Sequence, residues 1–128
     1  MPANRPEDCD LNLAKAIMSG DLESAVALYE DNATFVTGPD SVANGIDQIR
    51  EVMKGMLAEK PRLSLEVPRV VLSSDGNLAV LFSKWTSTVT GADGAEKSDS
   101  GNGREVVRKQ ADGTWKFIID CPTAGDSN

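Results

Sequence analysis

Histidine is absent from the 128 residues of this chain. Its absence removes the commonest general base, the Ser–His–Asp and Cys–His catalytic triads, and most transition-metal sites. Acid–base chemistry would then have to come from carboxylates, the single tyrosine, lysines or cysteines. We therefore expect neither a metal nor another cofactor.

Cysteine is scarce as well, with only Cys9 and Cys121 present. The two are far apart and form no CxxC pair, so their spacing gives no sign of zinc binding or redox chemistry. We interpret both as packing residues, because a free cysteine behaves as a small hydrophobic side chain. A disulfide between them is an open alternative.

Positive charge and long apolar runs are also lacking. The chain has 13 Lys and Arg against 20 Asp and Glu, a net charge of −7 and a sequence pI of about 4.5. Such a balance does not suit nucleic acid or an anionic membrane. No run approaches the ~18 apolar residues of a membrane span, and the first residues lack the apolar core of a signal peptide. We expect a cytoplasmic protein.

What is present indicates one domain. At 13.6 kDa the chain is of single-domain size. We expect the domain to span residues 1–128, with an ordered core over about residues 8–122 and tails at 1–5 and 123–128.

Three helices are predicted over residues 6–19, 21–29 and 46–57. Pro6 suits a first helical turn, Gly20 can end the first helix with a positive φ, and Asp21 can cap the second. The third helix has the best amphipathic spacing, and Pro61 prevents its continuation.

Strands are predicted over residues 34–37, 63–72, 78–89, 104–110 and 114–121. The second of these should be bent or bulged near Pro68, and a Gly- and Asp-rich loop is expected over residues 91–99. Helices segregated from an antiparallel sheet make an α+β domain. We expect a cone-shaped, curved antiparallel sheet wrapped over three N-terminal helices around an apolar cavity.

Several short motifs recur in this order in one known superfamily. They are Gly20-Asp21-Leu22, Leu28 to Ala33, Gly45 with Ile49, Ala79 with Trp85, Val107-Arg108-Lys109, and Asp112 to Lys116. In order and spacing they resemble the nuclear transport factor two-like superfamily, with its SnoaL-like and ketosteroid-isomerase-like proteins, over residues 8–122. The resemblance implies the cone-shaped fold but does not imply one activity, because the superfamily hosts many.

The resemblance also allows known active sites to be compared with this chain. Ketosteroid isomerase uses a tyrosine, an aspartate base and a carboxylic acid, and those positions fall here on Leu13, Thr37 and Glu105. Two of the three roles are lost, so we do not expect that mechanism. The His–Asp pairs of scytalone dehydratase and the polyketide cyclases cannot form without histidine. The Asp-Arg-Asp trio of limonene epoxide hydrolase has no convincing match.

Carboxylates on two strands remain as candidate catalytic residues. Alignment with the family's inward-facing positions, together with the two-residue period of a strand, directs Glu105 and Asp120 into an apolar pocket beside Trp85. Desolvation there would raise the pKa of a carboxyl group. The predicted pocket residues are Leu13, Ile17, Tyr29, Thr37, Met53, Ser83, Trp85, Ser87, Glu105, Val107, Ile118 and Asp120.

A structural role for the same carboxylates is the alternative. Glu105 could pair with Arg104, Arg108 or Lys84 at a sheet edge. Asp120 could accept hydrogen bonds from nearby backbone N–H groups.

Two functions are consistent with the sequence. The first is a homodimer, formed through the outer sheet face, that binds a small apolar or carboxyl-bearing ligand; a carboxylate-dependent isomerase, dehydratase or hydrolase activity is an open extension. The second is a non-catalytic assembly module similar to the association domain of calmodulin-dependent kinase. In that case Trp115, Phe117 and Ile119 would form the interface.

Overall fold

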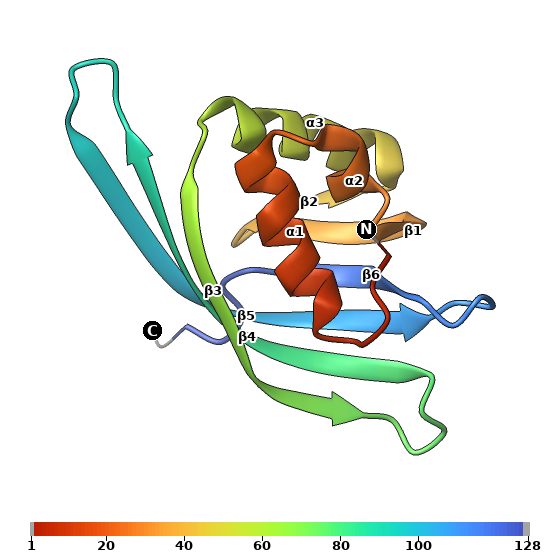
Figure 1. The fold of residues 1–128 in the computed structure, drawn as a ribbon. Coiled ribbons are helices and arrows are strands. Elements are labelled where there is room, and N and C mark those ends of the chain that lie inside the picture. Colours follow the sequence, from red (N-terminus) through yellow and green to blue (C-terminus); the bar gives the residue numbers. More distant parts are fainter. Residues whose placement is uncertain (1, 127–128) are drawn as a thin grey trace.

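A curved, unclosed six-stranded sheet wraps around three helices in the computed structural model, which describes residues 2–126 (Figure 1). The strand order is β2-β1-β6-β5-β4-β3. The α+β class expected from the sequence is therefore confirmed. The elements are α1 (Asp8–Ser19), α2 (Leu22–Val26), β1 (Tyr29–Gly38), β2 (Ser41–Asn44), α3 (Ile46–Ala58), β3 (Arg62–Leu72), β4 (Leu78–Thr90), β5 (Glu96–Lys109) and β6 (Trp115–Cys121).

The turn between α1 and α2 forms as predicted. Gly20 has a φ of 72°, and its N–H donates to the carbonyl groups of Ala16 and Ile17. Asp21 caps α2 by accepting a hydrogen bond from the backbone N–H of Ser24 at 3.1 Å. None of the helices in the described part of the chain is both long and apolar enough to cross a bilayer.

The strand β1 begins earlier than the sequence predicts, at Tyr29, which was expected to end the second helix. Its ring stacks on Phe117 of β6, with ring centroids 4.7 Å apart, and the Phe117 N–H donates to the Leu28 carbonyl at 2.8 Å. The strands β1 and β6 run parallel, whereas the other pairs are antiparallel. This parallel pairing and the short strand β2 are not anticipated by the sequence.

The hairpin of β4 and β5 is longer than predicted. The two strands pair continuously from Leu78 opposite Arg108 to Thr90 opposite Glu96. The predicted loop over residues 91–99 is therefore wrong, because only residues 91–95 turn and the rest belong to β5. The free end of this hairpin extends beyond the body of the molecule (Figure 1).

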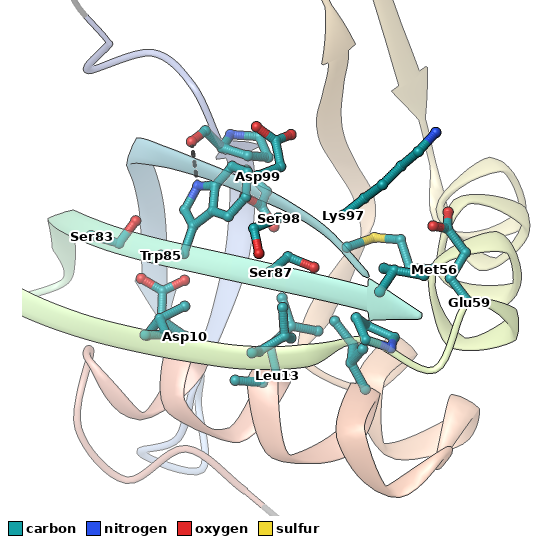
Figure 2. A pocket seen from close by; sticks show the side chains of 18 of the residues that line it. Asp10, Leu13, Met56, Glu59, Ser83, Trp85, Ser87, Lys97, Ser98 and Asp99 are labelled. Atoms are coloured by element: carbon teal, nitrogen blue, oxygen red, sulfur yellow. Dashed lines mark hydrogen bonds between the residues drawn. The ribbon is translucent and has the colours of Figure 1, made fainter. Parts of the chain in front are cut away.

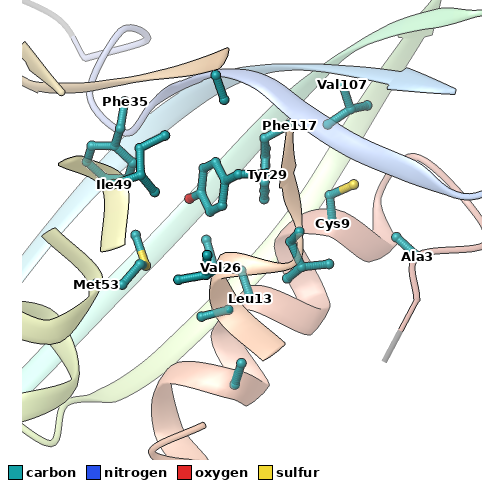
Figure 3. Close-up of a cluster of buried hydrophobic side chains, with 14 of the residues drawn as sticks. Ala3, Cys9, Leu13, Val26, Tyr29, Phe35, Ile49, Met53, Val107 and Phe117 are labelled. Carbon is teal, nitrogen blue, oxygen red and sulfur yellow. The ribbon is translucent and has the colours of Figure 1, made fainter. Parts of the chain in front are cut away.

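The hydrophobic core lies between the helices and the concave face of the sheet. Its largest buried side chains include Tyr29, Ile49, Met53, Val107 and Phe117, which gather in one cluster (Figure 3). The core keeps the sheet and helices packed at one end of the cone.

Parts of both predicted tails are packed against the sheet. Ala3 is buried, and its carbonyl accepts a hydrogen bond from the Trp115 N–H at 2.9 Å. Near the other end, the Gly125 N–H donates to the Asn102 carbonyl at 2.9 Å. Met1, Ser127 and Asn128, which also belong to the predicted tails, lie outside the described residues.

Candidate functional site

A cavity of about 900 Å³ lies between α1 and the concave face of the sheet (Figure 2). Cavities of this size hold small organic molecules. Most of its wall is apolar and comes from α1, β3 and β4, including Leu13, Ile17, Leu63, Leu65 and Trp85. The size and lining of the cavity thus suit a largely apolar molecule.

Three carboxyl groups lie at its buried end. Asp10, Glu105 and Asp120 line the cavity and are exposed by only 3%, 2% and 4%. Asp10 comes from the first turn of α1, and its spacing from Leu13 and Ile17 places it on the buried stripe of that helix. Glu105 and Asp120 are cross-strand partners on β5 and β6, so their side chains share the concave face.

Asp120 is held by Tyr29. The tyrosine hydroxyl donates a hydrogen bond to Asp120 Oδ2 at 2.5 Å. Burial, with the nearby Glu105 carboxyl, raises the pKa of Asp120 to about 7, and the Tyr29 hydrogen bond opposes that shift. Burial and the neighbouring Asp120 raise the pKa of Tyr29 well above its ordinary value, so the phenol keeps its proton.

Asp10 and Glu105 form a second pair. Asp10 Oδ2 and Glu105 Oε1 are buried, and no described residue outside the pair donates a hydrogen bond to either atom. Burial raises the pKa of both carboxyls; a hydrogen bond between the two raises the pKa of Glu105 further and lowers that of Asp10. Glu105 therefore holds the proton, and Asp10 is the first of the two to ionise.

Two glycines of β5 provide the space that this site needs. Gly101 lies opposite Trp85, and Gly103 lies opposite Ser83. A Cβ atom at Gly101 would lie 2.6 Å from the Trp85 ring. A Cβ atom at Gly103 would overlap both Glu105 Oε2 and Ser83 Oγ. The indole and the Glu105 carboxyl thus pack directly on the β5 backbone.

The SnoaL-like domain model matches residues 12–118 of the chain. The chain belongs to the SnoaL-like family. It is therefore a member of the nuclear transport factor two-like superfamily, as the sequence motifs indicate. No curated protein matches the chain at a significant level.

Solved structures of other proteins share this fold at low sequence identity. A ketosteroid isomerase-like protein from Erwinia carotovora atroseptica has a TM-score of 0.76 and 21% identity, over 90% of this chain and 89% of its own. A candidate scytalone dehydratase from Novosphingobium aromaticivorans has a TM-score of 0.80 and 15% identity, over 95% and 92%. A candidate calcium/calmodulin-dependent protein kinase II association domain from Xanthomonas campestris has a TM-score of 0.76 and 22% identity, over 91% and 82%.

Most of the pocket residues predicted for this SnoaL-like domain lie around this cavity. Those that line it are Leu13, Ile17, Ser83, Trp85, Ser87, Glu105 and Asp120. Tyr29, Met53 and Val107 lie in the core instead, where they are completely or almost completely buried. Thr37 is exposed at the end of β1, and its hydroxyl is hydrogen bonded to that of Ser41 at 2.7 Å.

Ile118 does not line the cavity because of a bulge in β6. Strict alternation predicts that Ile118 and Asp120 share a face opposite Phe117. However, the register shifts so that Val106 pairs with Ile119 and Val107 with Phe117, which leaves Ile118 unpaired. Phe117 and Asp120 therefore both face inward, and Ile119 is 43% exposed on the outer face.

The same bulge overturns the interface expected for an assembly module. Trp115 and Phe117 are exposed by 6% and 0%. Both are committed to the core of this SnoaL-like domain, so of the three expected interface residues only Ile119 is available to a partner.

Among the described residues, Glu105 forms no ion pair with Arg104, Arg108 or Lys84, although the charge of Arg104 lowers its pKa slightly against the effect of burial. Arg108 pairs with Glu30 at 2.9 Å, and the Arg104 guanidinium lies 4.4 Å from the centre of the Phe82 ring. Asp120 is hydrogen bonded to the Tyr29 hydroxyl.

Asp10 is the cavity carboxyl that sequence reasoning missed. A signal for it exists, because Asp10, Leu13 and Ile17 follow the i, i+3, i+7 spacing of one helix face. An acidic residue on an apolar stripe points to a buried carboxyl group. The first helical turn also suits an exposed aspartate, which is stabilised there by the helix dipole, and this hides the signal.

Proposed function

We propose that the cavity binds a small, largely apolar molecule and that the Asp10–Glu105 pair transfers a proton to or from it. The reaction would belong to the isomerase or dehydratase class. The observation that carries this proposal is the pair of buried oxygens, Asp10 Oδ2 and Glu105 Oε1, which receive no hydrogen bond from residues outside the pair and lie on the wall of a largely apolar cavity. Buried polar atoms normally find a partner, and a bound ligand would supply one.

The two carboxyls suit opposite roles. Asp10, which ionises first, would accept a proton from the ligand, and the protonated Glu105 would donate one or hydrogen bond to an oxygen that gains negative charge. Neighbouring carboxyls with separated proton affinities provide an acid and a base in one site. The printed names of two similar structures, isomerase-like and dehydratase, belong to the same reaction classes.

Solvent-deuterium exchange tests this function without knowledge of the natural substrate. Two apolar ketones of small-molecule size, 2-tetralone and 4-benzylcyclohexanone, would be incubated in D₂O with the protein, and loss of their α-protons would be followed by NMR. We expect the protein to accelerate exchange. Replacement Asp10→Asn or Glu105→Gln should lower the accelerated rate by about a hundredfold, a usual contribution of one acid–base group.

Asp40→Asn is the matched control, because it removes one carboxylate from an exposed turn that does not line the cavity. It should exchange at the wild-type rate. Thermal unfolding of each variant would show whether a lost rate reflects a lost fold. Equal exchange by wild type, Asp10→Asn and Glu105→Gln would contradict the proposed proton transfer.

A further inference from the structure

Nearly all the ionisable groups that line the cavity are acidic. At its buried end lie Asp10, Glu105 and Asp120. Its exposed rim carries Glu59, Asp93 and Asp99, while Lys97 is the only cationic side chain among the described residues that line it. Figure 2 shows Lys97 and Glu59 at the rim, well away from Asp10. A ligand that enters this cavity passes acidic groups and ends at acidic groups.

The buried end has no cationic side chain among the described residues that line the cavity. Asp10 is 3% exposed, and its Oδ2 atom receives no hydrogen bond from described residues outside the Asp10–Glu105 pair. Buried carboxyl groups are normally kept neutral by a proton, paired with a cation or bound to a metal ion. Glu105 holds its proton, whereas Asp10 is the first of the pair to ionise. Within residues 2–126, no group of three or more His, Cys, Asp or Glu side chains is arranged to hold a metal ion. A positively charged group on an organic ligand would therefore balance the charge of Asp10 once Asp10 has lost its proton.

We propose that the ligand of this cavity is an apolar molecule that carries a protonated amine, and that Asp10 and Glu105 bind the ammonium group. The inference rests on the proposed function of the cavity as a ligand site, and it adds the charge of the ligand. An ammonium group has three N–H donors, enough to reach both Asp10 Oδ2 and Glu105 Oε1. The apolar remainder would lie along Leu13, Leu65 and Trp85.

The same arrangement disfavours the carboxyl-bearing ligand that the sequence allowed. A ligand carboxylate at the buried end would meet three carboxyl groups, and it would be repelled strongly by each of them that is ionised, because the site is apolar. The acidic rim would also attract cations and repel anions during entry. Both ends of the cavity thus select for the same sign of ligand charge.

Three probes of nearly equal size test this proposal. They are 2-naphthylmethylamine, 2-naphthylmethanol and 2-naphthoate, which are positive, neutral and negative at about pH 8. Their dissociation constants would be measured by calorimetry with the full chain. We expect the amine to bind at least about tenfold more tightly than the alcohol, and the naphthoate to bind more weakly than the alcohol.

Asp10→Asn should reduce the ratio of amine to alcohol affinity, and Glu105→Gln should reduce it less, because Glu105 holds its proton. Asp40→Asn, which removes one negative charge from the surface, should keep the ratio. If the alcohol binds as tightly as the amine, or the naphthoate binds most tightly, the inference of a cationic ligand is overturned and the cavity remains a ligand site. If none of the three probes binds, the proposed ligand-binding function itself fails. A circular dichroism spectrum of each variant would separate a lost site from a lost fold.

Discussion

At the scale of single residues, Gly103 shows how little room the site has. A methyl group there would overlap the Glu105 carboxyl and the Ser83 hydroxyl. We expect Gly103→Ala to lower the free energy of unfolding by about 1–3 kcal/mol, as overpacking in a core does. Denaturant unfolding would measure the change.

Gly55 provides the matched control, because it lies in the exposed middle of α3, where an added methyl group would have nothing within 4 Å. Gly55→Ala should raise the free energy of unfolding by about 0.4–1 kcal/mol, since alanine restricts the unfolded chain. Destabilisation of equal size in both variants would contradict the proposed packing around Gly103.

The buried carboxyls should also make stability depend on pH. Burial raises the pKa of Asp120 from 3.8 to about 7, so the folded state holds a proton that the unfolded chain releases. The free energy of unfolding should therefore fall as the pH rises from about 4 to about 7, by roughly 1–4 kcal/mol for such a carboxyl. Thermal unfolding at a series of pH values would show this fall.

Asp120→Asn keeps an acceptor for the Tyr29 hydroxyl but cannot ionise. Its stability should fall less between pH 4 and 7 than that of the wild type. At still lower pH both proteins should lose stability, because hydrogen bonds to their side chains lower the pKa values of the turn and cap residues Asp21, Asp75 and Asp112. Identical profiles for the two proteins above pH 4 would show that Asp120 does not ionise in that range.

At the scale of elements, the sequence predicted correctly the helices, turns and bulges that depend on neighbouring residues. The Gly20 turn and α3 form where their sequences indicate. The bulge expected near Pro68 is also present, since the register of β3 shifts between Glu66 and Arg69. Gly20 and Pro68 act through their special backbone geometry, and α3 follows from the spacing of its apolar residues.

Structural features that depend on contacts between residues far apart in the sequence were not predicted. Tyr29 extends β1 because its ring stacks on Phe117, which is far away in the sequence. The polar start of β5, including Lys97 and Ser98, is a strand only because β4 pairs with it. Likewise, the bulge at Ile118 changes which β6 side chains face inward, and no glycine or proline in β6 marks its position. The grouping of Asp10 with Glu105 is a property of the folded chain alone.

At the scale of the whole molecule, the outer sheet face carries a continuous apolar row. Val71, Val80, Val106 and Ile119 are successive cross-strand partners on β3, β4, β5 and β6. Val71 and Ile119 are 40% and 43% exposed. Such a row across four strands is a surface that a second sheet can cover.

The exposed area of the chain is also large for a monomer. It is 7322 Å², whereas a compact protein of 13.6 kDa exposes about 6,600 Å². The excess of about 700 Å² is close to what one partner buries in a standard interface. We therefore propose that two copies associate through the outer face, as the sequence led us to expect.

Light scattering after size exclusion, at micromolar concentration, would test this association. The wild type should elute at twice the 13.6 kDa mass of one chain. Ile119→Asp should elute at the mass of one chain, because a carboxylate in the centre of an apolar interface would be buried without a partner. Leu72→Asp is the control: Leu72 is 55% exposed but is the cross-strand partner of the buried Ala79, so it does not belong to the outer row. A wild-type monomer, or a dimer that only Leu72→Asp disrupts, would exclude the outer face as the interface.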